Sequence, residues 1–198
     1  MKASQTLKKR QLRNQMRQHR RALSPLQQYH AGQQLYRQLC TQPLFQRAKH
    51  IALYLAQDGE IDPNATLQQI RKQHKTCYLP ILMPGNTLRF RPYRKNSRMK
   101  NNRFGIPEPQ GNHFRRTNAL DLVLLPLVAF DEKGGRLGMG GGFYDRTFAW
   151  IRQHPKMCRP KLLGLAHHFQ KVDELALESW DIPLDGIVTD KEILLLKN

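Results

Sequence analysis

A short apolar segment that leads into a glycine-rich segment constrains the fold of this 198-residue chain more than any other feature. Residues 121–126 read DLVLLP and predict a buried strand. Residues 134–145 are rich in glycine, and residues 143–153 are expected to form a helix. Ligands of open α/β sheets bind outside the carboxyl ends of the strands. We therefore expect the binding site at this strand–loop–helix unit.

The rest of the chain alternates between helix-like and strand-like segments. Helices are expected at residues 5–21, where the apolar stripe is thin, at 25–40, at 62–74 and, as a short piece, at 172–175. Further strands are expected at residues 50–55, 76–81, 87–93, 161–166 and 186–189, and a long basic loop at 94–119. This alternation predicts an α/β fold with a mostly parallel central sheet and helices on both faces.

The positive charge is large and unevenly distributed. The formal net charge is +18; the first 57 residues hold eleven Lys/Arg and no acid, and residues 71–116 hold twelve Lys/Arg with Glu108 as their only acid. Such a surface attracts polyanions, which include nucleic acids, phosphorylated cofactors and polycarboxylates. The charge indicates the sign of the partner and not its identity.

Several classes of protein are disfavoured. No apolar run approaches the length of a membrane span, and the basic N-terminus has no apolar segment typical of a secretory signal. The three cysteines, Cys40, Cys77 and Cys158, are widely spaced and form no metal or redox pattern. We expect inert thiols and a cytoplasmic protein.

The glycine-rich segment has the composition of a phosphate-binding loop. Glycine lets backbone N–H groups approach phosphate oxygens closely, and the following helix adds a favourable dipole. Arg136 can bind phosphate with two donors, and Asp145 can hold a divalent cation. The segment is neither a Walker A loop nor a Rossmann fingerprint, because the required Gly-Lys-Ser/Thr and sixth-position glycine are missing. A tightly packed glycine turn without a ligand is the alternative.

Five segments resemble, in order, the motifs of the 5-formyltetrahydrofolate cyclo-ligases, also called methenyltetrahydrofolate synthetases. They are KRQLR at residues 9–13, LAQDGEID at 55–62, FGIPEP at 104–109, PLVAFDEKGGRLGMGGGFYDR at 126–146, and WDIPLD at 180–185 followed by Val188-Thr189. The resemblance is collinear and spans nearly the whole chain. It implies a single three-layer α/β domain over residues 1–198, with the basic helix of residues 1–22 contributing to the nucleotide site.

The resemblance also implies a reaction. ATP and 5-formyltetrahydrofolate would give 5,10-methenyltetrahydrofolate, ADP and phosphate, with Mg²⁺. The formyl oxygen would attack the γ-phosphate, N10 would then attack the activated carbon, and phosphate would leave. In such phosphoryl transfers the protein mainly positions groups and neutralises charge.

Roles of individual residues follow from the same resemblance. Arg136 would stabilise the moving phosphoryl group, and Asp145 and Asp181 would bind magnesium. The positions that match the nucleotide site are Lys9, Arg10, Arg13, Arg136, Leu137, Gly138, Met139, Gly140, Gly141, Gly142, Phe143 and Tyr144. The positions that match the folate site are Leu55, Glu60, Met139, Gly140, Gly141, Gly142 and Phe143, and Tyr144 could stack there. Leu55 also suits a core position.

Two positions depart from the pattern of the family, and some alternatives stay open. Some relatives carry Lys where this chain has Gly141, and many carry His where it has Trp180. The basic charge leaves open a protein that binds RNA or DNA, although no nucleic-acid motif is found. A different ATP-dependent ligase or kinase is a second alternative. Polyglutamate tails on the folate would explain the charge without nucleic acid. We expect a monomer, although the sequence leaves the oligomeric state open.

Overall fold

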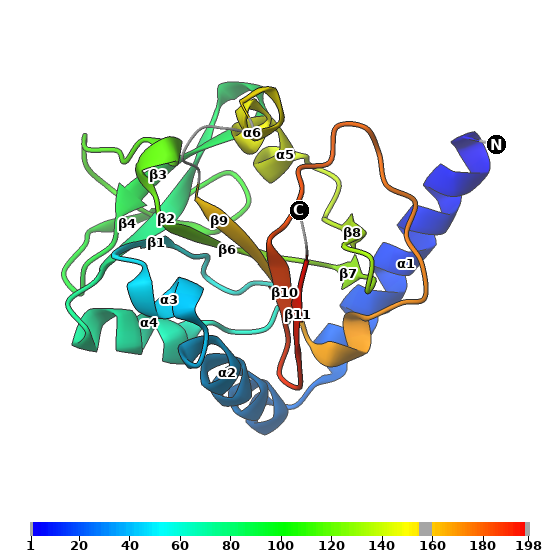
Figure 1. Ribbon diagram of the computed structural model, residues 1–198, viewed down its shortest axis with the longest axis horizontal. Helices are drawn as coiled ribbons and strands as arrows, with labels where there is room; N and C mark the ends of the chain where they lie inside the picture. Colours follow the sequence, from blue (N-terminus) through cyan, green and yellow to red (C-terminus); the bar gives the residue numbers. More distant parts are fainter. Residues whose placement is uncertain (1, 155–159, 197–198) are drawn as a thin grey trace.

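A central sheet organises the chain, which the computed structural model describes for residues 2–154 and 160–196 (Figure 1). The sheet contains β1 (His50–Ala52), β2 (Thr76–Met83), β3 (Thr87–Pro92), β6 (Leu122–Pro126), β9 (Lys161–Leu165), β10 (Gly186–Val188) and β11 (Ile193–Leu195). Its seven strands lie in the order β11-β10-β9-β6-β1-β2-β3. Neighbours from β10 to β2 pair parallel, whereas β11 and β3 pair antiparallel at the two edges.

Helices cover both faces of the sheet. Figure 1 shows α2 (Pro25–Cys40), α3 (Pro43–Arg47) and α4 (Asn64–Lys72) below it, and α5 (Phe143–Phe148) and α6 (Trp150–Gln153) above it. The lower core packs Leu35 and Ile70 against Leu124, and the upper core packs Phe148 against Val123. Consecutive residues of β6 thus face opposite layers, which explains why this strand is apolar throughout. The predicted α/β fold class is confirmed.

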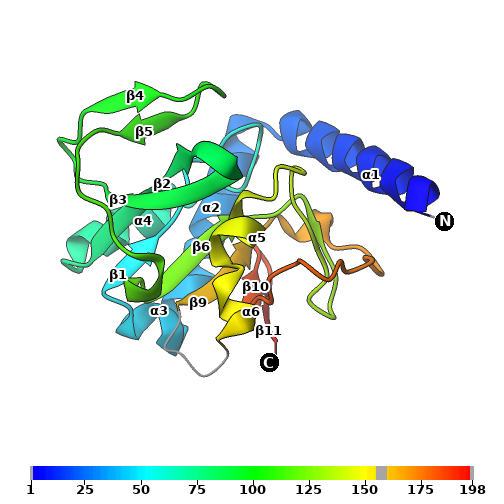
Figure 2. The same cartoon turned by 90° about the horizontal axis from the view of Figure 1, so that it is seen from above.

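The first helix, α1 (Lys2–Ala22), stands apart from these layers. In Figure 2 it extends along one side of the molecule. Its thin apolar stripe is buried only at Met16, which packs with Val128 and Leu137, while Leu7 stays exposed. The helix is therefore anchored by its second half and by a Lys9–Glu178 ion pair, while Lys8 and Arg10 face solvent.

The second helix begins where the sequence signals predict. The Ser24 hydroxyl accepts a hydrogen bond from the Gln27 backbone N–H, and the Gln27 side chain accepts one from the Ser24 N–H. This capping box, with Pro25 in the first turn, satisfies donors that a helix start leaves free.

The long loop predicted at residues 94–119 contains structure of its own. It forms a hairpin of β4 (Met99–Asn101) and β5 (Pro107–Pro109), and a 3₁₀ turn, η2 (Thr117–Ala119). Glu108 holds the hairpin to the sheet, because its carboxylate accepts hydrogen bonds from the Leu82 N–H at 2.9 Å and the Asn102 side chain at 2.8 Å. The short strands lack the alternation that would reveal them in the sequence.

Some predicted boundaries are wrong. The short helix expected at residues 172–175 is irregular chain with a bend at Asp173, because Val172 N–H donates to the Phe130 carbonyl and Leu175 N–H donates to the Asp131 carboxylate. A 3₁₀ turn, η3 (His168–Gln170), precedes it. The strand expected at 50–55 ends at Ala52, and β11 was not predicted. The helix expected at 143–153 is interrupted at Ala149.

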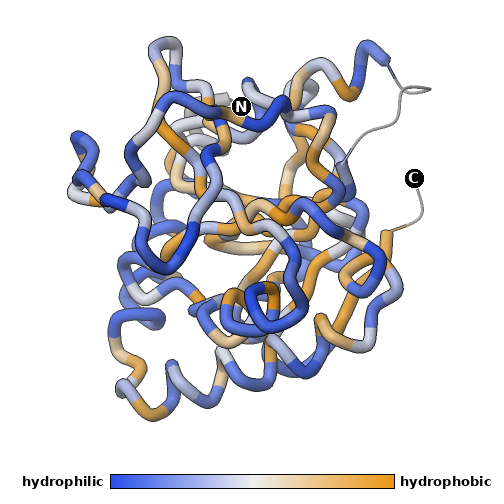
Figure 3. Tube along the Cα trace, turned by 90° about the vertical axis from the view of Figure 1, so that its left-hand side faces the viewer, coloured by the Kyte–Doolittle hydropathy of each residue, from blue (hydrophilic) through white to orange (hydrophobic). Residues whose placement is uncertain are grey.

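A small hairpin of β7 (Ala129–Phe130) and β8 (Arg136–Leu137) leads into the glycine-rich segment, which continues as irregular chain up to α5. The 3₁₀ turn η1 (Pro84–Asn86) lies elsewhere, between β2 and β3. Figure 3 shows apolar chain concentrated in the central strands, with hydrophilic chain around them. Among residues 2–154 and 160–196, no helix combines the length and apolar character needed to cross a membrane.

Candidate functional site

The loop between β8 and α5 has the backbone of a ligand-binding turn. Gly140 and Gly142 have φ values of 94° and 63°, which L residues with side chains rarely adopt. Gly142 is the N-cap of α5, and a Cβ there would lie 2.8 Å from the Arg146 guanidinium. The loop therefore requires glycine at these two positions. A Cβ on Gly141 would lie 2.6 Å from the Phe143 ring, so a lysine there would require that ring to move.

The basic face of α1 lies against this loop. Arg13 Nε donates a 2.8 Å hydrogen bond to the Gly138 carbonyl oxygen, and a Cβ on Gly140 would lie 3.6 Å from the same guanidinium. Lys9, one turn earlier, forms a 2.7 Å ion pair with Glu178. Arg10 is exposed on the same helix. The structure thus brings Arg13 to the glycine loop, whereas Lys9 pairs with Glu178 in the chain after β9. Their contact with a nucleotide stays a prediction.

Arg136 lines a neighbouring cavity and pairs with Asp145, which lies outside the cavity lining. The Arg136 side chain is only 7% exposed; it pairs with the Asp145 carboxylate and donates to the Ile182 carbonyl oxygen. Asp145 Oδ1 also accepts a 3.3 Å hydrogen bond from the Ile182 N–H. A buried guanidinium held by two partners has a fixed orientation.

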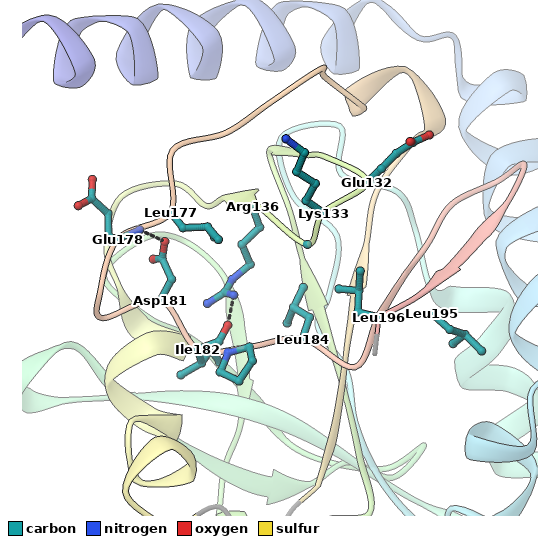
Figure 4. A pocket seen from close by; sticks show the side chains of 12 residues that line it. Glu132, Lys133, Arg136, Leu177, Glu178, Asp181, Ile182, Leu184, Leu195 and Leu196 are labelled. Carbon is teal, nitrogen blue, oxygen red and sulfur yellow. Dashed lines mark hydrogen bonds between the residues drawn. The ribbon is translucent and has the colours of Figure 1, made fainter. Parts of the chain in front are cut away.

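The cavity has a volume of about 450 Å³ and is lined on one side by the chain around Asp181. Figure 4 shows Arg136 pointing towards Ile182, with Glu178 and Asp181 beside it. The Glu178 N–H donates to Asp181 Oδ2 at 2.9 Å and the Asp181 N–H donates to the Glu178 carbonyl at 3.0 Å, which closes a tight turn. Trp180, in this turn, is exposed.

The donor set around this cavity fits a magnesium ion that arrives with phosphate groups. Asp145 and Asp181 come from different elements, and Ile182, which follows Asp181, is bonded to Asp145. Within the described ranges, no group of three His, Cys, Asp or Glu side chains could hold a metal by itself. Mg²⁺ commonly binds through one or two carboxylates, with the remaining ligands from substrate phosphates and water.

A second part of the site surrounds Glu60, in the loop after β1. Glu60 Oε2 accepts a 3.0 Å hydrogen bond from the Gln57 N–H. Burial raises the pKa of Glu60 to about 7, although that hydrogen bond and the positive charge of Arg20 oppose the rise. Burial, and after it the negative charge of Glu60, raise the pKa of Tyr144. The roles of Glu60 in a folate site and of Tyr144 in a nucleotide site stay predictions.

The remaining predicted residues lie around this centre. Leu55 is half-buried and packs against the lower core, so its contact with a ligand is a prediction. Met139 is exposed at the loop, and Leu137 is buried against α1. The Phe143 ring packs edge-to-face against the ring of Phe104 from the β4–β5 hairpin, with the two ring centroids 6.2 Å apart. In Figure 2 this hairpin and α1 lie on the same side of the sheet, with the chain leading to α5 between them.

The sequence reasoning missed several residues that hold the site together. Glu178 pairs with Lys9, Arg152 donates to the Ser179 carbonyl, and Arg17 belongs to an arginine cluster on Asp58. Arg17 could have been predicted from the sequence, because Lys9, Arg13 and Arg17 follow one another at intervals of four residues and so share one helix face.

The cysteines behave as expected where they are described. Cys77 is buried, which raises its thiol pKa to about 12, and Cys40 is half-buried and free. Cys158 lies outside the described residues. A thiol with so high a pKa has little thiolate and is a poor nucleophile, so Cys77 is a packing residue.

Comparisons with known proteins agree in pointing to one family. A model of the 5-formyltetrahydrofolate cyclo-ligase family matches residues 5–190. Proteins named 5-formyltetrahydrofolate cyclo-ligase from Haemophilus influenzae and Escherichia coli K12 are each 43% identical; the matches cover 92% and 90% of this chain and 98% of each relative.

Solved structures give the same result. The structure of the Aquifex aeolicus 5,10-methenyltetrahydrofolate synthetase matches with a TM-score of 0.80 and 30% identity, over 96% of this chain and 93% of that one. The Mycoplasma pneumoniae 5,10-methenyltetrahydrofolate synthetase matches with a TM-score of 0.71 and 28% identity, over 92% and 99%.

Proposed function

Because the chain belongs to the 5-formyltetrahydrofolate cyclo-ligase family, we propose that it couples ATP cleavage to ring closure of 5-formyltetrahydrofolate. The products would be 5,10-methenyltetrahydrofolate, ADP and phosphate. The observation that carries the proposal is that one helix, α1, contacts both predicted parts of the site. Arg13 donates to the Gly138 carbonyl oxygen in the glycine loop, and Arg17 pairs with Asp58, two residues before Glu60.

The nucleotide end of the proposed site binds phosphates through cations and backbone donors. The glycine loop from Gly138 to Gly142 would present N–H groups to phosphate oxygens, and Lys9 and Arg13 would neutralise their charge. Magnesium held by Asp145, Asp181 and phosphate oxygens would reduce the negative charge of the triphosphate. These residues place the γ-phosphate for attack by the formyl oxygen.

Arg136 is the proposed catalytic residue. Its guanidinium has five N–H donors, so the contacts with Asp145 and Ile182 leave donors for the phosphoryl group. Both contacts fix its orientation before substrate binds. Preorganised positive charge of this kind stabilises a transition state in which negative charge spreads over the transferring oxygens.

The folate end of the proposed site depends on Glu60. An ionised carboxylate accepts hydrogen bonds from the ring N–H and amine of a pterin, and such charge-assisted bonds are strong. Leu55 and the chain from Met139 to Phe143 would provide apolar and backbone contacts around the ring. Ring closure then needs N10 close to the activated formyl carbon, which this placement of the pterin would achieve.

A basic cavity supports a role for folate polyglutamate tails. This cavity, of about 670 Å³, is lined by Arg89, Arg115 and Arg116, and the Phe114 ring lies under the guanidinium of Arg89 at 5.3 Å. The carboxylates of a tail would bind to these arginines, which would explain the basic charge without a nucleic-acid partner. If so, kcat/KM should rise with tail length at low salt and lose that dependence at high salt.

The organisation of the chain follows from these assignments. Residues 1–198 would act as one cyclo-ligase domain in a monomer, to which α1 contributes nucleotide contacts. The free, unreactive thiol of Cys77 supports a reducing compartment such as the cytoplasm.

A spectrophotometric assay tests the proposed reaction. The purified protein is mixed with 5-formyltetrahydrofolate, ATP and Mg²⁺, and growth of the near-ultraviolet band of the methenyl product is followed. Mixtures without ATP and without Mg²⁺ are the controls. Growth only in the complete mixture is the expected result. ATP binding without product would instead indicate another ligase or kinase. Absence of both product and ATP binding would favour a protein that binds nucleic acid.

A further inference from the structure

Three arginines of α1 converge on one carboxylate in the loop after β1. Arg17 Nε lies 2.6 Å and Arg20 Nη2 lies 3.0 Å from Asp58 Oδ2, while Arg21 Nε bonds Oδ1. Burial raises the pKa of Asp58, but hydrogen bonds from Arg17 and Arg21 outweigh that effect, so the Asp58 pKa lies below its usual value. Asp58 is therefore an anion that ties the loop to the last turns of α1.

The backbone next to Asp58 is held as tightly as its side chain. Asp58 and Gly59 have φ values of 52° and 71°, and a Cβ on Gly59 would lie 2.7 Å from the Arg20 backbone. The Gly59 carbonyl oxygen accepts hydrogen bonds from Gln28 Nε2 at 3.0 Å and from His167 Nε2 at 3.1 Å. Contacts from α1, α2 and the chain after β9 thus fix the position of this turn.

This fixed turn ends at Glu60, the residue proposed to hold the pterin. Glu60 follows Gly59 directly, and its carboxylate reaches back to the Gln57 N–H. Arg20 is fully buried, and its charge acts on both Asp58 and Glu60. Its Nε and Nη1 atoms have no hydrogen-bond partner in the part of the chain that the structure describes. The positive charge of Arg20 therefore favours the ionised carboxylate of Glu60 as well as that of Asp58.

One face of α1 reaches both halves of the proposed site. Residues four apart on a helix lie above one another. Lys9 and Arg13 point to the Glu178 turn and the glycine loop, whereas Arg17 and Arg21, further along, point to Asp58. The helix that contacts the nucleotide loop also holds the loop that carries Glu60.

We propose that Asp58 is a positioning residue for the folate subsite: clamped by Arg17, Arg20 and Arg21, it sets the place of Glu60 while touching no substrate itself. The inference rests on the proposed function, because it assigns Glu60 to the pterin. This positioning role differs from a purely structural role in its effect on ligand binding. Loss of the clamp should weaken folate binding selectively and leave nucleotide binding and folding largely intact.

The test is Asp58→Asn in the full chain, which keeps the shape of the side chain and removes its charge. Binding of 5-formyltetrahydrofolate is measured by equilibrium titration without ATP, and ATP binding is measured separately. We expect the folate Kd to rise about tenfold and the ATP Kd to change less than twofold. Glu174→Gln is the matched control: it makes the same charge change in the exposed Lys133–Glu174 pair and should leave both constants unchanged.

A second variant covers the case in which Asp58→Asn does not fold. Arg17→Gln combined with Arg21→Gln removes the two more exposed arginines of the clamp and keeps Arg20. It should raise the folate Kd in the same direction, by a smaller factor. Folate binding unchanged in folded variants, or folate and ATP binding weakened equally, would overturn the proposal. Absence of folate binding by the wild-type protein would instead contradict the proposed function.

Discussion

Arg13 donates a 2.8 Å hydrogen bond to the carbonyl oxygen of Gly138, and so joins the first helix of the chain to the glycine loop. The two residues are 125 positions apart. The bond holds the guanidinium over the loop, beside the place where a Cβ of Gly140 would stand. Arg13 is thus positioned to reach a phosphate bound by the same loop.

Arg13→Gln should therefore weaken ATP binding. A hydrogen bond to a charged group is worth about 1.5–3 kcal/mol, so we expect the KM for ATP to rise about tenfold or more. The KM for 5-formyltetrahydrofolate should change much less. Lys8→Gln, an equal charge change at an exposed position of α1, is the control. Equal effects of the two variants would mean that only the overall charge matters.

Arg136→Ala should lower kcat more than it raises the KM for folate. The proposed contact strengthens in the transition state, and loss of one such donor typically reduces kcat by about 100-fold or more. Arg152→Ala is a matched control, because Arg152 also holds the 178–182 chain through a backbone carbonyl but from an exposed position. An unchanged kcat in Arg136→Ala would remove Arg136 from catalysis.

Asp145→Asn should raise the Mg²⁺ requirement. The substitution removes a negative charge from the proposed metal site, so the Mg²⁺ concentration for half-maximal rate should rise about tenfold at saturating ATP. Asp173→Asn, at an exposed position, provides the same charge change as a control. If the Mg²⁺ dependence of Asp145→Asn matched that of the wild type, the metal assignment would fail.

Folate binding should depend on pH through Glu60. Its pKa is raised by burial to about 7, so the carboxylate that would bind the pterin is ionised only above that value. We expect kcat/KM for folate to rise with pH through about 7. Glu60→Gln should lower folate affinity and abolish this step in the profile. A step that persists in Glu60→Gln must come from another group.

Ionisation of Glu60 should favour folate binding but lower the stability of the folded protein. The ordinary pKa of 4.5 for this carboxyl is lower than its folded-state pKa, so the folded protein binds the proton more tightly. Stability is therefore lost as pH rises from about 4.5 to about 7. Glu60→Gln should raise Tm more at pH 8 than at pH 5. A gain of the same size at both values would show that ionisation of Glu60 is not the cause.

Gly142→Ala should destabilise the loop. Gly142 has a φ of 63°, a conformation that costs residues with a Cβ about 1–2 kcal/mol, and the added methyl would also displace Arg146. For a chain of this size we expect Tm to fall by roughly 2–8 °C. Gly138→Ala, where a Cβ meets nothing within 4 Å, should leave Tm unchanged. Equal stability of the two variants would contradict this explanation.

Local patterns in the sequence determined the main elements of the fold. The run DLVLLP predicts β6, because a strand buried on both faces must be apolar at consecutive positions. The Ser24-Pro25 signal places the start of α2, since capping is a local interaction. The glycine-rich segment and the family motifs identified the loop and its charged neighbours. These features depend on residues close together in the chain.

Only the tertiary structure decided which distant residues meet. The irregular chain at residues 172–175 replaces a predicted helix because Phe130 and Asp131 supply its hydrogen-bond partners. The three arginines on Asp58 and the Lys9–Glu178 pair likewise join segments far apart in the sequence. Charge patterns reveal that a helix is basic, but the position of a carboxylate across the molecule depends on how the layers pack. For that physical reason, the sequence determined the elements and the chemistry of the loop, and the packing determined which carboxylate each cation holds.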